Sequence, residues 1–188
     1  MSQAYLDTID SPVGAIQFAT NSEGALLRLS FLDGHYPLTL QQELERDGFA
    51  LSQDAAHTGQ ARAELMEFFA GKRRSFDVPV ILQGSPFQVT VWSALRRIPF
   101  GETRTYAQLA GMIQRPAAAR AVGRANATNR IPLVIPCHRV IGADGSLTGF
   151  AGGIYLKERL LAFEMSHMAS QEDAAKQPQP GALSLARA

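Results

Sequence analysis

The first 31 residues alternate apolar and polar positions at the spacing of β-strands. Three short apolar runs are separated by Ser11-Pro12-Val13-Gly14 and by Asn21-Ser22-Glu23-Gly24, and both separators have the composition of tight turns. Leu27, Leu29 and Phe31 alternate with polar residues, so we expect the third strand to leave one face in water. Three short antiparallel strands are not stable alone. The pattern therefore predicts a small sheet covered by a helix.

Two helices are predicted after these strands. Residues 39–46 place Leu40 and Leu44 four apart, which is typical of one helix face. Thr58 has the chemistry of an N-cap for a second helix that reaches about Ala70, with Gly71 ending it. Residues 33–57 otherwise show no clear period.

After Leu82-Gln83-Gly84, the apolar residues recur at the spacing of helices. We interpret these three residues as the link between two structural units. Ser85 and Pro86 supply a capping hydroxyl and a first-turn proline for a helix that stops at Pro99. Its apolar stripe consists of Phe87, Val91, Ala94, Leu95 and Ile98.

A helix-turn-helix is predicted next. Thr105 caps a helix with apolar residues at helical spacing, Pro116 breaks the chain, and another helix runs over residues 117–127. Its core-facing positions are expected to be Ala118, Ala121, Val122 and Ala125. The other face combines small residues with arginines: Ala119, Gly123 and Ala127 beside Arg120 and Arg124. Such a face suits either a close approach to a polyanion or close packing of two helices.

These patterns predict an α+β protein. We expect an N-terminal domain over residues 1–83, with a small three-stranded antiparallel sheet and a helix, and a mostly helical C-terminal domain over 84–167 that contains the helix-turn-helix. The last helix is expected over residues 155–165. Residues 168–188 are rich in Ala, Gln, Pro and Ser, so we expect a disordered tail.

Composition narrows the classes of function. The 188 residues hold one cysteine, which excludes an internal disulfide and a cysteine-rich zinc site. No run of about 18 apolar residues could cross a membrane, and the N-terminus lacks the pattern of a signal peptide, so we expect a cytoplasmic protein. The net charge is only +1, but the stretch between residues 96 and 139 holds eight arginines and one acid. We interpret this stretch as a basic field for a polyanion.

The candidate nucleophile is the single cysteine, Cys137. His138 follows it directly, and an imidazole can accept the proton of a thiol. Adjacent residues point apart in extended chain, so contact needs a sharp turn at Pro136 or a bridging water. Glu164 lies four residues after Leu160, near the buried side of the last helix, where a carboxylate needs a partner such as His138. The plain alternative is a small buried cysteine in an apolar core segment.

The segment from Pro86 to Glu164, about 80 residues, closely resembles the O6-alkylguanine-DNA alkyltransferases, also called methylated-DNA–protein-cysteine methyltransferases. The resemblance rests on many matches in the same order. They are Phe87-Gln88-Val89, Val91-Trp92, Ile98 to Thr103, Tyr106, Leu109-Ala110, Arg120 to Gly123, Asn129, Pro136 to Val140, Gly149-Phe150, Gly152-Gly153, Lys157, Leu160-Leu161 and Glu164. Residues 1–82 fit the family's N-terminal, ribonuclease-H-like domain only in outline.

The resemblance implies how DNA is bound. The partner is double-stranded DNA containing alkylated guanine or thymine, and the helix-turn-helix sits in the minor groove. The DNA-binding residues it implies are Ala119, Ala121, Gly123 and Arg124, together with Arg120, which takes the space of the damaged base as that base swings out. We expect a monomer, and cooperative binding along DNA is left open.

The resemblance also implies the chemistry. Glu164, His138 and a water deprotonate Cys137, which takes the alkyl group from O6-alkylguanine, or from O4-alkylthymine, and keeps it. Tyr106 donates to the purine as charge leaves O6, and Asn129 shapes the cysteine turn. The protein is consumed in one event, with no metal and no cofactor.

The base pocket that the resemblance implies is formed around Val140, Phe150, Ala151 and Gly152. Phe150 stands where many members of the family have tyrosine, so one hydroxyl is missing and the lesion preference is expected to differ. Three other functions share features with this sequence. They are an alkyl-lesion sensor that recruits excision repair without transfer, a cysteine hydrolase, and a transcription regulator. The presence of Cys137 argues against the first, and the adjacent Cys-His pair is a poor spacing for the second.

Overall fold

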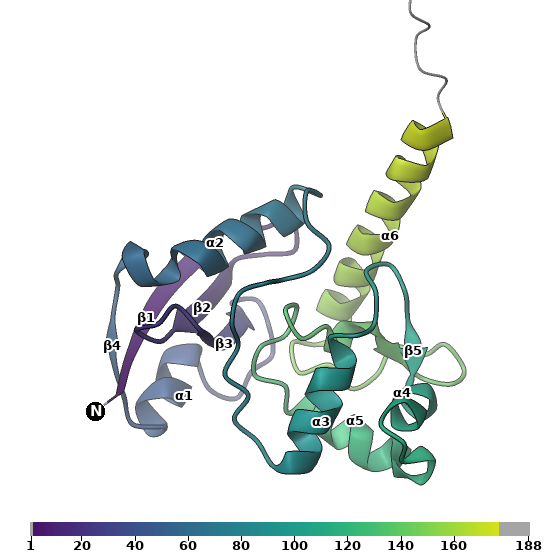
Figure 1. Ribbon diagram of the computed structural model, residues 1–188, viewed down its shortest axis with the longest axis horizontal. Coiled ribbons are helices and arrows are strands. Elements are labelled where there is room, and N and C mark those ends of the chain that lie inside the picture. The colour runs from purple at the N-terminus through teal and green to yellow at the C-terminus, as the bar shows by residue number, and fades with distance from the viewer. Residues whose placement is uncertain (1, 177–188) are drawn as a thin grey trace, which may run out of the picture.

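A four-stranded sheet forms the centre of the N-terminal region in the computed structural model, which describes residues 2–176 (Figure 1). The strands are β1 (Ser2–Ile9), β2 (Ile16–Thr20), β3 (Leu26–Phe31) and β4 (Phe49–Ser52), in the spatial order β3-β2-β1-β4. The first three strands pair antiparallel, as predicted, whereas β4 pairs parallel with β1. The fold class predicted from the sequence is confirmed, and β4 is an additional strand.

Two helices cover opposite faces of this sheet. Helix α1 (Leu40–Arg46) packs through Leu40 and Leu44 against a small cluster on one face, and helix α2 (Ala55–Phe69) packs on the other face as part of the main core. The short helix at 39–46 is confirmed, with Thr39 as its N-cap.

The predicted N-cap of α2 is wrong. The helix begins one turn earlier, where the side chain of Asp54 accepts a hydrogen bond from the backbone N–H of Ala56. Thr58 is buried inside the helix, and its hydroxyl donates to the carboxylate of Asp7 on β1 at 3.0 Å. A threonine can therefore satisfy its hydroxyl against a neighbouring strand as well as at a cap.

The expected wet face of β3 is also wrong, because the polar residue on it is covered. Arg28 is 1% exposed. Its guanidinium donates to the carboxylate of Asp47 at the end of α1 and to the side chain of Gln83, which lies between the two halves of the chain. The residue type suggested water, but Asp47 neutralises the buried guanidinium and Gln83 accepts a further hydrogen bond from it.

Three helices of the C-terminal region pack together and contribute to the main core. They are α3 (Pro86–Leu95), α4 (Tyr106–Met112) and α5 (Ala119–Ala127), with the short 3-10 helix η1 (Pro116–Ala118) before α5. Ser85 and Thr105 cap α3 and α4 in full capping boxes, as the sequence predicted. The predicted helix-turn-helix is α4, η1 and α5.

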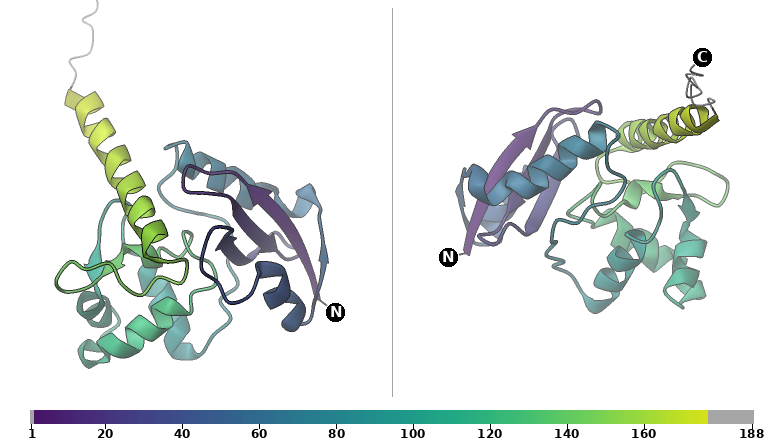
Figure 2. Two further views of the ribbon diagram at one scale, coloured as in Figure 1. Left: turned by 180° about the vertical axis from the view of Figure 1, so that it is seen from behind. Right: turned by 45° about the horizontal axis from the view of Figure 1, so that its top comes forward.

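The cysteine lies between these helices and the last one. Strands β5 (Arg104–Thr105) and β6 (Val140–Ile141) pair parallel, and the 3-10 helix η2 (Cys137–Arg139) directly precedes β6. Helix α6 (Ile154–Lys176) then runs out past the other elements (Figures 1 and 2). It therefore continues into the predicted tail, because no glycine or proline interrupts residues 166–176. The remaining tail residues, 177–188, lie outside the described residues.

Strand β3 joins the two regions of the chain. The backbone N–H of Leu26 donates to Pro79, the N–H of Ile81 donates back to Leu26, and the N–H of Leu29 donates to the carbonyl of Arg130 at 2.9 Å. The N-terminal sheet is thereby held against the segment that leads to the cysteine. Among the described residues, no helix has the length and apolar character needed to cross a membrane.

Candidate active site

A sharp turn presents Cys137. Pro136 has φ −78° and ψ 65°, and the backbone N–H of Cys137 donates to the carbonyl of Ile135 at 2.7 Å. This is the geometry of an inverse γ-turn. The side chain of Asn129 braces it, since its amide nitrogen donates to the same carbonyl at 2.8 Å. The turn expected at Pro136 is therefore present.

The thiol of Cys137 is almost fully buried, with 3% of the residue exposed. Burial raises the pKa of the Cys137 thiol to about 11, while the Asn129 side chain and the charge of Lys157 act to lower it. A thiol in this environment stays protonated at neutral pH and reacts only if a base removes its proton.

The base closest in sequence, His138, is completely buried and oriented by a carboxylate. Its Nε2 lies 2.7 Å from Oε1 of Glu164, which comes from α6. The sequence placed Glu164 on the buried side of this helix, and the structure brings it to His138.

Glu164 has further partners that the sequence did not reveal. Arg139 donates to its carboxylate through Nε and Nη2, the latter at 2.9 Å, and the backbone N–H of Gly101 donates at 2.8 Å. Burial alone would raise the pKa of Glu164, but hydrogen bonds from His138 and Arg139, together with the charge of Arg139, hold it at about 2. The carboxylate is therefore ionised at neutral pH and can only accept hydrogen bonds.

An ionised Glu164 determines which ring nitrogen of His138 carries the proton. Burial lowers the pKa of His138 and outweighs Glu164, which acts to raise it, so the ring is neutral at pH 7. A neutral ring that faces an acceptor must carry its proton on Nε2. Nδ1 then holds a free lone pair, and it is buried without a hydrogen-bond partner.

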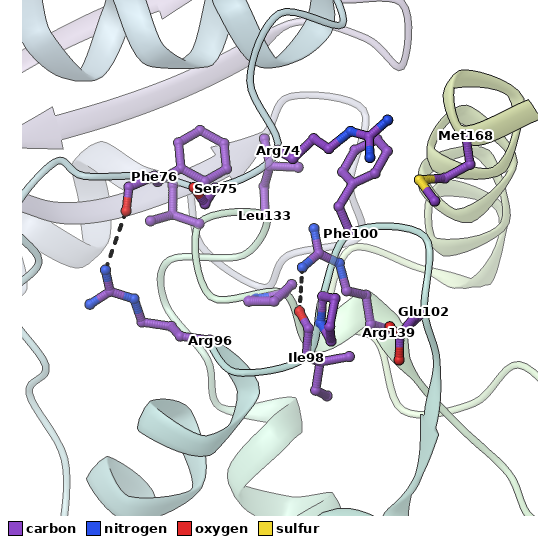
Figure 3. A pocket seen from close by; sticks show the side chains of 13 residues that line it. Arg74, Ser75, Phe76, Arg96, Ile98, Phe100, Glu102, Leu133, Arg139 and Met168 are labelled. Atoms are coloured by element: carbon purple, nitrogen blue, oxygen red, sulfur yellow. Dashed lines mark hydrogen bonds between the residues drawn. The ribbon is translucent and has the colours of Figure 1, made fainter. Parts of the chain in front are cut away.

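Arg139 belongs to this buried hydrogen-bond network and not to the predicted basic surface. The residue is 4% exposed, and its Nη1 donates to the carbonyl of Ile98 at 2.7 Å (Figure 3). It lines a hollow of about 470 Å³ behind the cysteine turn, together with Phe100 and Met168 (Figure 3). The prediction that Arg139 belongs to a polyanion-binding surface is wrong, because Glu164 neutralises it inside the fold.

Lys157 is a second buried cation beside the thiol. Its ammonium donates to the carbonyls of Val140 and Thr148, the latter at 2.6 Å. Burial lowers the pKa of Lys157 to about 8. The sequence matched this lysine to the family without giving it a role. Lys157 lies between Leu156 and Leu160 on the apolar side of α6. This position in the sequence pattern could have identified the lysine as buried.

The expected pocket residues differ in their exposure. Val140, Phe150 and Gly152 are buried, whereas Ala151 is exposed and lines a hollow of about 240 Å³ together with Asn129. Tyr106 donates through its hydroxyl to the carbonyl of Thr148 at 2.9 Å.

The expected DNA-facing helix α5 exposes Arg120 and Arg124. Val122 and Ala125 are buried, as predicted, and Asn126 is buried as well. The prediction for Ala121 is wrong, because this residue is exposed instead of facing the core. Ala119 and Gly123 are half-buried: Ala119 packs against the core, and Gly123 lies beside the ring of Tyr106.

A thiol followed directly by an oriented, neutral imidazole is an arrangement typical of proteins that use cysteine as a nucleophile. Within residues 2–176, no three histidine, cysteine, aspartate or glutamate side chains come close enough together to hold a metal ion.

Comparison with known proteins identifies the family. Residues 86–166 match the family model of the 6-O-methylguanine DNA methyltransferase DNA binding domain, and residues 4–82 match that of its ribonuclease-like domain. A methylated-DNA–protein-cysteine methyltransferase of Methanosarcina barkeri is 44% identical over 165 residues, covering 87% of this chain and 99% of the relative. One of Mycolicibacterium paratuberculosis is 45% identical over 160 residues, covering 85% and 92%.

Solved structures agree. The crystal structure of the Mycobacterium tuberculosis O6-methylguanine methyltransferase has a TM-score of 0.75 at 42% identity, covering 88% of this chain and 94% of that one. A structure described as Mycobacterium tuberculosis OGT in complex with DNA has a TM-score of 0.74 at 40% identity, covering 87% and 94%. The chain belongs to the methylated-DNA–protein-cysteine methyltransferase family of enzymes, and the resemblance noted in its sequence is confirmed.

The ion pair of Glu164 should show in the pH dependence of stability. Its pKa of about 2 in the fold lies below the value of about 4.3 in an unfolded chain. Its stabilising contribution is therefore complete above the unfolded value and is lost as pH falls toward 2. Between pH 5 and pH 3, the unfolding free energy should fall by about 2 kcal/mol more in the wild type than in Glu164→Gln.

Urea denaturation followed by the fluorescence of the single tryptophan, Trp92, measures this difference. Glu158→Gln is the matched control, because Glu158 is exposed on the same helix. It should behave as the wild type does. Equal acid sensitivity in Glu164→Gln and the wild type would contradict the assignment.

Proposed function

We propose that this enzyme repairs DNA by moving the alkyl group of O6-alkylguanine, and of O4-alkylthymine, irreversibly onto Cys137, with one transfer per molecule. The observation that carries the proposal is the unpartnered Nδ1 of His138, buried beside a thiol that needs a base. Membership of the family supports the reaction class.

The proton path begins at the thiol. No direct hydrogen bond joins the thiol of Cys137 to the imidazole of His138, so a water carries the proton from the sulfur to Nδ1. The imidazolium that forms keeps its Nε2–H on Glu164, whose charge stabilises it. The charge of Lys157 favours the thiolate at the same time.

The transfer step is a displacement at carbon. The sulfur forms a bond to the alkyl carbon, the bond from that carbon to O6 breaks, and its electron pair stays on the guanine. Tyr106 exchanges its hydrogen bond to the carbonyl of Thr148 for one to the purine, and Val140, Phe150, Ala151 and Gly152 form the pocket around the base. The product is a thioether. Because thiol exchange acts on S–S bonds and not on C–S bonds, the protein is used once.

Helix α5 is the surface for double-stranded DNA in this proposal. Arg120 and Arg124 are exposed one turn apart on it, and Arg120 fills the space in the base stack that the flipped nucleotide leaves. The crystal structure of the similar Mycobacterium tuberculosis protein in complex with DNA supports DNA as the partner. The division into domains at residues 1–83 and 84–167 is part of the same proposal.

The mass of the intact protein tests the transfer. After incubation with duplex DNA that contains O6-methylguanine, the wild type should gain one methylene equivalent per molecule, located on Cys137 by peptide mapping. Cys137→Ser should gain nothing. Binding without a gain in mass would indicate a lesion sensor, and repeated turnover by unmodified protein would indicate a hydrolase.

The role of Arg120 is tested by comparing two substrates. In Arg120→Ala, transfer from duplex DNA should fall about 10- to 100-fold, because unstacking a base costs a few kcal/mol that the arginine offsets. Transfer from free O6-benzylguanine needs no flipping and should stay within about twofold.

Arg124→Ala is the matched control on the same helix face. Its loss should disappear at saturating DNA, as expected for a phosphate contact, whereas the loss in Arg120→Ala should persist. Equal losses of Arg120→Ala on both substrates would refute a role in base flipping.

A further inference from the structure

Tyr36 comes from the N-terminal region but reaches toward the cysteine. It lies in the loop between β3 and α1, and Pro37 restricts its backbone to extended conformations. A Cβ atom at Gly34 would overlap with the ring of Tyr36, so glycine at this position lets the ring pack closely on its own loop.

The hydroxyl of Tyr36 is buried and has no hydrogen-bond partner. A Cβ atom at Gly152 would lie 3.0 Å from this oxygen and 2.9 Å from the ring of Phe150. Burial raises the pKa of Tyr36, and a negative charge on Cys137 raises it further. The hydroxyl therefore lies next to Gly152, one of the expected pocket residues, and close enough to Cys137 for a charge on the sulfur to act on it.

A buried hydroxyl without a partner costs free energy and needs an explanation. The other tyrosine near the thiol, Tyr106, does not have this property, because its hydroxyl donates to the carbonyl of Thr148 at 2.9 Å. Tyr36 thus presents a donor that the protein itself leaves unused. Such a donor is available to a ligand that enters the pocket.

The side chain of Tyr36 also borders a hollow of about 240 Å³. Tyr36, Pro37 and Leu38 line it from the N-terminal region, and Asn129 and Ala151 line it from the other side. Asn129 contacts the cysteine turn. The hollow therefore lies beside the segment that leads to the cysteine.

The loop of Tyr36 is held at a defined distance from the cysteine turn. Asp47, at the end of α1, accepts hydrogen bonds from Arg28 on β3 and from Arg130, the latter at 2.8 Å. The N–H of Leu29 also donates to the carbonyl of Arg130. These contacts lie on both sides of the loop and tie it to the C-terminal region.

We infer that Tyr36 is a substrate-contacting residue of the alkyl-transfer reaction, donating a hydrogen bond from its hydroxyl to O6 of the alkylated guanine. The inference rests on the proposed function. O6 is the purine atom that carries the alkyl group, so it is the acceptor closest to the sulfur when that group meets Cys137. The N-terminal region would then contribute directly to the chemistry.

The hydrogen bond acts on the leaving group. When sulfur bonds to the alkyl carbon and the carbon–oxygen bond breaks, negative charge develops on O6. A donor already aimed at that oxygen stabilises the charge more in the transition state than in the substrate. Tyr36 keeps its proton throughout, because it donates a hydrogen bond and does not act as an acid.

Tyr36→Phe tests the inference by removing one oxygen atom and keeping the ring. In single-turnover transfer from duplex DNA with O6-methylguanine, the limiting rate should fall about 10- to 100-fold, the range expected for losing a hydrogen bond to a developing charge. The DNA concentration at half-maximal rate should change by less than about twofold, because a contact made mainly in the transition state affects the rate and not the binding.

Stability separates this role from a structural one. Removing a buried hydroxyl that has no partner should leave the melting temperature of Tyr36→Phe unchanged or raised. Tyr155→Phe is the matched control, since Tyr155 is 71% exposed on α6, and its limiting rate should equal that of the wild type.

The outcomes distinguish the two proposals. If wild-type Cys137 gains no methyl group, the proposed function fails. If the wild type reacts and Tyr36→Phe reacts at the same rate, only the role of Tyr36 is refuted. A lowered melting temperature together with a slower rate would also overturn it, because it would show that the hydroxyl supports the fold.

Discussion

The carboxylate of Glu164 is the interaction on which the arrangement of the site depends. It is buried, and burying a charge is costly unless the charge is paired and fully hydrogen-bonded. His138, Arg139 and the backbone of Gly101 satisfy it together. These partners come from the cysteine turn and from the loop after α3, so one side chain on α6 holds three segments of the chain in register.

The charge of Glu164 also prepares the chemistry. It keeps the proton of His138 on Nε2 and leaves Nδ1 free, while burial keeps the thiol of Cys137 protonated until a base acts. Lys157 adds a positive charge beside the sulfur without occupying it, because its ammonium is bound to backbone carbonyls. The buried thiol therefore becomes reactive only when a base accepts its proton.

Much of the fold and the centre of the site could be predicted from the sequence. Helix caps such as Ser85 and Thr105 and the apolar stripes of the helices depend on neighbours in the chain, so the sequence predicts them. The position of Glu164 on the inner side of α6 was predicted in the same way, from its spacing to Leu160. Features that depend on distant partners were missed. Strand β4 has only four residues and pairs with β1, far away in sequence. Arg28 and Arg139 are arginines whose burial depends on acids elsewhere, and Tyr36 lies in a loop without any period.

The protonation of the His138 ring tests the central claim most directly. Nitrogen-15 NMR of the DNA-free protein at pH 7 distinguishes a ring nitrogen that carries a proton from one that does not. The structure predicts a neutral ring with its proton on Nε2 and an unprotonated Nδ1. A proton on Nδ1, or a doubly protonated ring, would contradict the account, since His138 could then not accept the proton of Cys137.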